Sequence, residues 1–551
     1  MAGPGESAQD VADRDDAHLR SLGIKPELRR TLGFLSNFAI AFAFISVSTG
    51  TFGNYGVGIG LSGPAFYWTW FIVIGGQLLV ALVFAELASH YPVAGSVYQW
   101  SKRLSHRTLG WFTGWFYFWA QVVTVSAVAV IVAFVVDALH SSLVGTTGDT
   151  AFLDTASPGG FTSMFTFIAI GTLIITTLIN AYGVRLLSIL NNIGVATEIL
   201  GMFVFAIILL IFANVQPVSV LTSFEGSEAA QNGNIPATFA LGFFMAAFVV
   251  FGFDTAGTFG EETLDASRQA PRGVLSSILI SGLVGAIFIP AVILATPDIP
   301  GSMAAGLGGA FPIGTTISEA FSKDIIGNLS GGDIYLLVIL ASVFVCTLAI
   351  QGAATRLMFS MGRDHHLPFG STWGHVNTRF RTPANAAVGV GVIAALPILV
   401  VGPGPAVSIS IAATGLIYVA YFMCNAGVLA ARFRGWPHQK AWFSLGRWGK
   451  LVNVLALIYG GLMIVNIALW ADGSLFGDWG TDGRLFWNPY INTFIKPFGN
   501  EIAGMPAWPI FETLIGAILI FGGIYYALAV RGSARDAETQ ADVLTGEAVI
   551  G

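Results

Sequence analysis

Long apolar runs recur along the whole chain and limit its fold more than any other feature. A helix needs about 20 mostly apolar residues to cross the hydrocarbon core of a bilayer. By that rule the sequence predicts twelve spans, which begin near Phe34, Pro64, Thr108, Phe161, Ser188, Ile235, Val274, Gly332, Ala384, Ala406, Leu451 and Pro509. Only 10% of the 551 residues are charged, against about 25% in a soluble protein. We therefore expect an all-α integral membrane protein.

Lysine and arginine are distributed unequally between the loops that would join these spans. One set of loops carries three of them, Lys323, Arg484 and Lys496, whereas the other set and the two ends of the chain carry 21. The positive-inside rule therefore predicts a multi-pass protein of the plasma (inner) membrane with both termini in the cytoplasm. The first 30 residues are polar and lack the apolar region of a cleavable signal peptide, so we expect a disordered cytoplasmic tail there.

Two spans are interrupted near their middle by glycine and small polar residues. The first contains FISVSTGTFGNYGVGIG and the sixth contains VVFGFDTAG. Glycine weakens a helix by about 1 kcal/mol relative to alanine, and a span that unwinds must turn its free backbone groups toward protein, water or a ligand. The interruptions open two successive groups of five helices, which would give the groups opposite orientations around a central substrate site. The alternative is that these glycines only permit close helix packing.

The candidate substrate-binding residues lie in these interruptions. The N-terminal ends of half-helices carry partial positive charge and suit a carboxylate, whereas free carbonyl groups suit an ammonium group. Such a site fits a small zwitterion. The candidates are Ser46, Val47, Ser48, Thr49 and Gly50 in the first span, and Phe248, Phe251, Gly252, Phe253, Asp254 and Thr255 in the sixth, with Gln121 of the third span lining the path.

Four motifs resemble those of one family of membrane transporters. They are AELASHYPVAGSVYQW at the end of the second span, NNIGVATEILG in the fifth, FGFDTAGTFGEETLDASRQAPRG in and after the sixth, and GAATRLMFSMGRDHHLP at the end of the eighth. On these motifs the chain resembles the amino acid–polyamine–organocation permeases, and within them the amino acid/choline branch that includes 4-aminobutyrate permeases. The resemblance implies a LeuT-type inverted repeat of five plus five helices, with helices 1 and 6 broken and two peripheral helices, that works by alternating access.

The resemblance also implies a division of the chain and roles for single residues. The segments are a tail at 1–32, a first repeat at 33–213, a second repeat at 214–434, peripheral helices at 435–531 and a tail at 532–551. The family's Gly-Ser-Gly turn corresponds to Ser48-Thr49-Gly50, whose amides would receive a substrate carboxylate. The carbonyl groups of 251–255 would receive an amine, and Phe248 would be the gating aromatic residue. Where some proton-coupled relatives have a lysine in the fifth span, this chain has Glu198.

Two carboxylates are expected near the middle of the membrane, where a charge is costly and usually functional. Asp254 is predicted to pair with a substrate ammonium, and the alternative is a local cap on unwound backbone amides. Glu198 is predicted to contribute to proton coupling, and the alternative is a structural hydrogen bond. Asp254 is a second candidate for the coupling role.

Three glutamates are expected near the cytoplasmic ends of helices. Glu86, Glu261 and Glu262 have basic neighbours in the adjoining loops and are predicted to form a salt-bridge network rather than a substrate site. Arg356, inside the eighth span, is predicted to pair with one of them or to extend to the interface.

The histidine and cysteine residues predict neither a metal site nor a disulfide. His365 and His366 are adjacent in a loop and are expected to be exposed. Cys346 and Cys424 lie in apolar runs and are expected to be buried free thiols.

The sequence favours a secondary active transporter over other membrane proteins. Its predicted substrate is a small amino acid or amino acid-like zwitterion, such as 4-aminobutyrate, moved together with protons or alternatively Na⁺. Two alternatives stay open: an amine without a carboxylate, such as choline, ethanolamine or a polyamine, and an amino acid/amine exchanger. Free amides at Ser48-Thr49-Gly50 would favour a carboxylate, whereas an aromatic cage would favour a quaternary ammonium.

Channels and membrane-embedded enzymes fit the sequence less well. A repeated filter loop is missing from the pattern, and so is a nucleophile–base set at membrane depth. We expect no cofactor, no metal and no nucleic-acid partner. Membrane lipid is the expected surrounding, and the sequence leaves the oligomeric state open.

Overall fold

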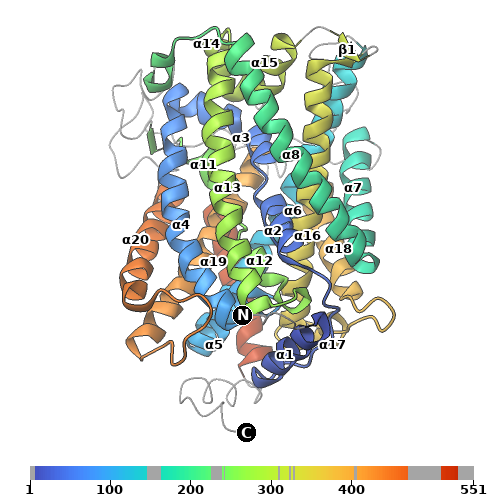
Figure 1. The fold of residues 1–551 in the computed structure, drawn as a ribbon, viewed down its shortest axis with the longest axis vertical. Coiled ribbons are helices and arrows are strands. Elements are labelled where there is room, and N and C mark those ends of the chain that lie inside the picture. The colour runs from blue at the N-terminus through green and yellow to red at the C-terminus, as the bar shows by residue number, and fades with distance from the viewer. Residues whose placement is uncertain are drawn as a thin grey trace, which may run out of the picture.

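The computed structural model describes residues 7–144, 163–224, 239–240, 242–307, 311–321, 324–326, 329–401, 406–469 and 510–531. Helices make up most of this part of the chain, and most of them run along the long axis of the molecule (Figure 1). A short hairpin of β1 (Asp324–Ile326) and β2 (Leu329–Ser330) is the strand structure of the described residues. The prediction of an all-α fold is confirmed.

Nine helices of the described part are long and apolar enough to cross a membrane. They are α2 (Phe34–Ile45) with α3 (Val47–Ser62), η1 (Pro64–Phe66) with α4 (Tyr67–His90), α6 (Arg107–Val144), α7 (Met164–Tyr182), α8 (Val184–Phe212), α13 (Ala266–Ala295), α16 (Gly331–Arg363), α19 (Ala406–Phe433), and η5 (Gly446–Trp448) with α20 (Gly449–Leu469). Three further segments correspond to the remaining predicted spans. Two are shorter apolar helices, α18 (Ala384–Val401) and α22 (Ile510–Tyr525), and the third is the broken segment of α11 (Phe243–Val249) and α12 (Thr255–Thr258).

Several predicted positions do not coincide with helix boundaries. α8 begins directly after Gly183, and α13 begins after Asp265, so both start earlier than the sequence predicted. Their first turns carry polar and basic residues, which hydropathy assigns to loops. Phe161, Ile235, Pro509, Lys323, Arg484, Lys496 and the tail 532–551 lie outside the described residues.

Short elements cover the two ends of the bundle (Figure 1). One end carries α1 (Ala8–Ser21), α5 (Ser96–Leu104), η4 (Gly260–Glu262) and α17 (Gly370–Trp373). We call this end the basic face, because the loops with most of the lysine and arginine lie there. The other end carries η3 (Val218–Thr222), α14 (Ile299–Leu307) and α15 (Pro312–Ala320). On the side of the basic face, η7 (Tyr526–Val530) continues α22 and contacts the first turn of α6 through Arg107 and Thr108.

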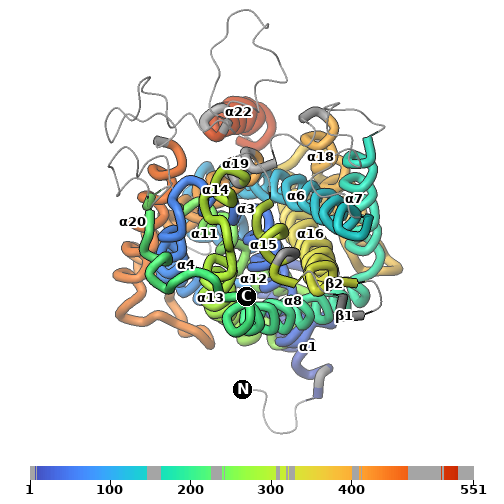
Figure 2. Tube along the Cα trace, turned by 90° about the horizontal axis from the view of Figure 1, so that it is seen from above, coloured from blue at the N-terminus to red at the C-terminus, as the bar shows by residue number. Residues whose placement is uncertain are grey.

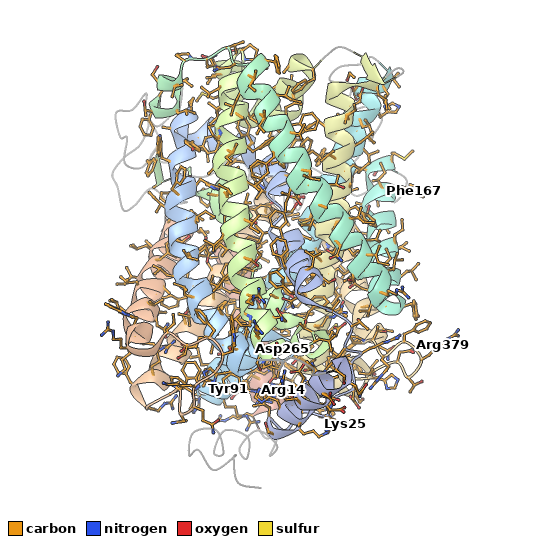
Figure 3. The ribbon with its side chains drawn as sticks, in the orientation of Figure 1. Arg14, Lys25, Tyr91, Phe167, Asp265 and Arg379 are labelled. Atoms are coloured by element: carbon orange, nitrogen blue, oxygen red, sulfur yellow. The ribbon has the colours of Figure 1, made fainter. Side chains whose placement is uncertain are left out.

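The interior and the periphery of the bundle differ in their helices. Figure 2 shows α3, α11 and α12 inside a ring that includes α20, α22, α7 and α8. Trp70, Trp100 and Trp111 are fully buried, whereas Phe167 on α7 is 74% exposed and points outward (Figure 3). Exposed apolar side chains on outer helices suit contact with lipid rather than water.

The N-terminal segment is ordered from residue 7, so the prediction of a disordered tail is wrong for this part. Ser7 and Asp10 form a capping box that starts α1, and Leu19 of α1 is buried. Arg14 of this helix forms an ion pair with Asp265 across 3.0 Å (Figure 3). Arg30 donates to Asp16 at 2.9 Å and to the carbonyl of Thr263 at 3.0 Å. These ion pairs and hydrogen bonds attach the segment to the basic face, and composition alone does not reveal them.

The three glutamates of the basic face form separate buried ion pairs. Glu262 binds Arg356 at 2.8 Å, Glu261 binds Arg363 at 3.0 Å, and Glu86 binds Arg432. Each of these glutamates is at most 2% exposed. Pairing of Arg356 with a glutamate is confirmed, but the pairs lie in the protein interior, where removal of one partner costs about 3–5 kcal/mol.

The two adjacent histidines differ in burial. His365 is exposed as predicted, whereas His366 is 1% exposed, so the prediction is wrong for it. The Tyr98 hydroxyl lies 2.6 Å from His366 Nδ1 and donates to Asp364 at 2.7 Å. Burial alone would raise the pKa of Asp364, but Lys102 and neighbouring basic groups hold that pKa well below its usual range.

The two cysteines are buried and free, as the sequence predicted. Each lies in a long helix, Cys346 in α16 and Cys424 in α19. Both therefore behave as small apolar side chains rather than as a disulfide.

Candidate functional site

The first predicted interruption is a real break between α2 and α3. Ser46 separates the two helices with φ 36° and ψ 87°, a left-handed conformation that is uncommon for residues other than glycine. Its hydroxyl accepts from the Thr49 amide at 3.4 Å and so acts as the N-cap of α3. We call this position the first break.

A carboxylate from another helix occupies the start of α3. Glu198 of α8 accepts three hydrogen bonds: from the Ser48 amide at 3.0 Å, from the Ser48 hydroxyl at 2.9 Å and from the Ser46 hydroxyl at 3.1 Å. All three reach the same oxygen, Oε1, and Glu198 is 1% exposed. A negative charge is favourable at a helix N-terminus.

The expectation of free amides at Ser48-Thr49-Gly50 therefore needs correction. The Ser48 amide is bound to Glu198, and the Thr49 amide to the Ser46 hydroxyl. The Gly50 amide donates to the Ser46 carbonyl at 3.0 Å and closes the first turn of the helix. The protein itself satisfies the groups that were predicted to wait for a substrate.

The sixth-span interruption is also a real break. α11 ends at Val249, and α12 begins at Thr255. Gly252 between them has φ 91°, and a Cβ atom there would lie 1.9 Å from Cδ1 of Phe44. Only glycine suits both the backbone conformation and this close approach. We call residues 250–254 the second break.

Asp254 is held by hydroxyl groups from three other helices. It accepts from Ser96 of α5 at 2.7 Å, from Tyr117 of α6 at 2.5 Å and from Tyr421 of α19. The Tyr421 hydroxyl also accepts from the Gly252 amide at 3.0 Å. The Asp254 side chain makes no capping bond to α12, so the alternative of a local cap gains no support from this helix.

The two breaks meet each other in the interior of the bundle. The rings of Phe44 and Phe251 lie 6.1 Å apart, and those of Phe248 and Phe251 lie 5.7 Å apart. A Cβ atom at Gly50 would lie 2.4 Å from a methyl group of Val249, so α3 and α11 are in close contact. The glycines thus serve close packing as well as unwinding, and both interpretations hold.

The remaining candidates take different positions. Val47 is the first residue of α3, and Thr255 is the first residue of α12. Phe253 lies beside Tyr421, with the ring centroids 5.6 Å apart. Gln121 is fully buried on α6 one turn beyond Tyr117, in neither break.

Sequence reasoning missed the groups that hold the carboxylates. Ser96, Tyr117 and Tyr421 are far from Asp254 in the chain. Tyrosines inside apolar spans were a usable signal, because a buried hydroxyl needs a hydrogen-bond partner.

The charges at the breaks are acidic. α2, α3, α11 and α12 contain no lysine, arginine or histidine, and Asp254 and Glu198 are buried carboxylates at the two breaks. Among the described residues no group of three or more metal-ligating side chains occurs. Such a site suits a ligand that carries an ammonium group.

Comparisons with known proteins agree on one family. The family model for amino acid permeases matches residues 32–474. The amino-acid permease BAT1 of Arabidopsis thaliana is 30% identical over 473 residues, which cover 83% of this chain and 89% of BAT1. The thiamine transporter thi9 of Schizosaccharomyces pombe is 25% identical over 506 residues, which cover 84% of this chain and 82% of thi9.

A solved transporter shares the fold. The crystal structure of MhsT in complex with L-phenylalanine matches with a TM-score of 0.55 at 15% identity, and the match covers 79% of this chain and 97% of MhsT. MhsT has the LeuT-type fold, so this part of the prediction is confirmed. The chain belongs to the amino acid permease family and is a membrane transporter rather than an enzyme.

Proposed function

We propose that the protein is a secondary active transporter that moves a small amino acid or amino acid-like zwitterion, such as 4-aminobutyrate, by alternating access. The observation that carries this proposal is the meeting of the two breaks, where Gly252 lies against Phe44 and Gly50 against Val249. Unwound backbone at membrane depth is tolerated where it faces protein, water or a ligand. The contact between the breaks supports a shared substrate site there.

In the proposed site the two ends of the substrate face different breaks. The ammonium group lies near the carbonyl groups of 251–255, and the acidic surroundings favour it. The carboxylate lies near the start of α3, beside Glu198. We propose protons as the coupling ion, with Na⁺ as the alternative. The unequal distribution of lysine and arginine supports a cytoplasmic basic face in the plasma membrane.

A second candidate substrate is an amine without a carboxylate. The bond between the Ser48 amide and Glu198 favours this candidate, because it removes a donor that a substrate carboxylate would use. Aromatic rings also gather at the breaks, and these attract organic cations. The relative thi9 is a thiamine transporter, and thiamine is such a cation.

Uptake by purified protein in proteoliposomes tests this proposal. The panel contains amino acids, 4-aminobutyrate, choline, ethanolamine and a polyamine, each measured under a proton gradient and under a Na⁺ gradient separately. We expect saturable, gradient-driven uptake of an amino acid. Uptake that requires substrate inside the vesicles would indicate an exchanger instead, and uptake of amines alone would favour the second candidate. If no amino acid or amine is taken up, the proposal fails.

A further inference from the structure

The start of α3 holds a carboxylate that belongs to the protein. We propose that Glu198 is a specificity-determining residue: when ionised it holds the start of α3 and favours a substrate without a carboxylate, and a carboxylate-bearing substrate binds only together with a proton on Glu198. This inference rests on the proposed function. It goes further, because it links the charge of the substrate to the binding of a proton at one residue.

The geometry places Glu198 where a substrate carboxylate would bind. The first amides of a helix point outward and lack intrahelical partners. In α3 one of these, the Ser48 amide, donates to Glu198 at 3.0 Å, and both serine hydroxyls at the break donate to the same oxygen. The Thr49 amide has a long bond of 3.4 Å to the Ser46 hydroxyl. A substrate carboxylate at Thr49 would therefore lie beside the carboxylate of Glu198.

Two carboxylates that share one buried site do not both stay ionised. Glu198 is 1% exposed, so water cannot screen its charge. Arrival of a substrate carboxylate therefore requires a proton, and the free oxygen of Glu198 is the place for it. All three donors bind Oε1, so a proton on Oε2 leaves them in place. An ammonium group without a carboxylate has the opposite preference, because it is attracted by ionised Glu198.

Other titratable groups around Glu198 do not supply this proton. α8 packs against α2, α7, α13 and α16, and α3 contacts Glu198 through the first break. The charged or titratable residues of these helices are Arg185, Tyr182, Arg268, Arg272, Asp333, Tyr335, Cys346, Arg356, Arg363 and Tyr55. Of these, the Cys346 thiol is the group with an electrostatic interaction with Glu198, and it donates to the Phe44 carbonyl at 3.5 Å. Arg356 is bound to Glu262.

Binding at different pH values tests the inference without any gradient. The probes are three pairs that differ by one carboxylate: 4-aminobutyrate and butylamine, L-alanine and ethylamine, L-phenylalanine and phenethylamine. Affinities of the purified protein in detergent are measured by calorimetry from about pH 5.5 to 8, where carboxylates and amines of the free probes keep their charge. The affinity for the amino acid should fall about tenfold per pH unit above the range in which Glu198 titrates. The affinity for its amine should stay constant or rise.

Glu198→Gln supplies the neutral form of the side chain. In this variant the affinity for the amino acid should be independent of pH and close to the wild-type value at low pH. The control is Asp298→Asn, which neutralises an exposed carboxylate outside both breaks and should keep the wild-type pH dependence. Above the range in which Glu198 titrates, wild-type protein in weak buffer should also take up about one proton per bound amino acid, a readout that does not depend on the folding of any variant.

The outcomes separate this inference from the proposed function. If the amino acid binds or is transported with an affinity independent of pH in the wild type, or if Glu198→Gln keeps the pH dependence, the inference is wrong and the proposed function stands. If amines bind and no amino acid binds at any pH, the carboxylate never reaches α3, and the inference is also wrong. If neither member of any pair binds, the proposed function fails and this inference fails with it.

Discussion

Each of the two breaks holds a buried carboxylate, but the two carboxylates are held in opposite ways. At the first break the carboxylate comes from a separate helix, and Glu198 is held through hydroxyl and amide groups of Ser46 and Ser48 alone. At the second break the carboxylate belongs to the break itself, and Asp254 is held by three other helices. At the first break a proton on Glu198 Oε2 would change the charge and leave the three bonds to Oε1 in place. The second ties α12 to α5, α6 and α19, so it fixes geometry.

The backbone conformation is also more tightly constrained at the second break than at the first. Ser46 adopts a strained left-handed conformation, whereas Gly252 adopts a φ of 91° directly against the ring of Phe44. Substitutions at the second break should therefore have larger effects than substitutions at the first.

Gly252→Ala should have the largest effect. The new Cβ would lie 1.9 Å from Cδ1 of Phe44, and the positive φ would be strained as well. Together these should cost about 3–5 kcal/mol, and uptake should be lost. Thermal unfolding in detergent and proteoliposome uptake measure both effects. Gly75→Ala in α4 is the control, because no atom lies within 4 Å of its added Cβ. Since alanine favours a helix over glycine, this variant should unfold at the wild-type temperature or above it. Equal unfolding temperatures for the two variants would contradict the tight fit at the second break.

Asp254→Ala should be the next most damaging change. It leaves the hydroxyls of Ser96, Tyr117 and Tyr421 without their acceptor, at a cost of about 2–4 kcal/mol in total. Asp254→Asn keeps one acceptor oxygen and should fall between Ala and the wild type in both unfolding temperature and uptake. If both variants are inactive in uptake but as stable as the wild type, Asp254 acts through its charge on the substrate instead of through these contacts.

The sequence predicts the positions of both breaks but not the partners of their carboxylates. Small and polar residues interrupt an apolar pattern, and that interruption is local, so Ser46 and Gly252 are visible in the sequence. The partners of Asp254 come from segments more than 130 residues away, and their approach depends on helix packing. Glu198 was visible as a buried charge, but its contact with Ser48 depends on the side of α8 that faces α3.

The basic face shows the same limit. A buried arginine requires an anion, so pairing of Arg356 with a glutamate follows from the sequence. The position of α1 does not, because its residues are as polar as those of a free tail. Its attachment comes from single contacts such as Arg14 with Asp265. The sequence shows that a buried charged residue needs a partner of opposite charge. It does not show which of several distant residues provides that partner.

Tyr421→Phe should have a smaller effect than the changes at Asp254. The variant loses the bond to Asp254 and leaves the Gly252 amide without its acceptor, at about 2 kcal/mol. Tyr117→Phe is the matched comparison, because it removes a bond to Asp254 and leaves the acceptor of the Gly252 amide in place, so it should cost about 1 kcal/mol. The unfolding temperature should be lowest for Tyr421→Phe, higher for Tyr117→Phe and highest for the wild type. The reverse order would show that the second break does not depend on the Gly252 bond.

Ser46 should show the smallest effect, because two terms oppose each other there. Ser46→Ala removes the hydroxyl bonds to Glu198 and to the Thr49 amide and keeps the strained φ of 36°, so it should cost about 1 kcal/mol. Ser46→Gly loses the same bonds but relieves the left-handed strain, so its cost should be a few tenths of a kcal/mol. Both variants should keep uptake, since Ser48 still holds Glu198 through its amide and hydroxyl. If Ser46→Gly were as damaging as Gly252→Ala, the first break would be as rigid as the second, and its carboxylate would no longer be the one expected to respond to a proton.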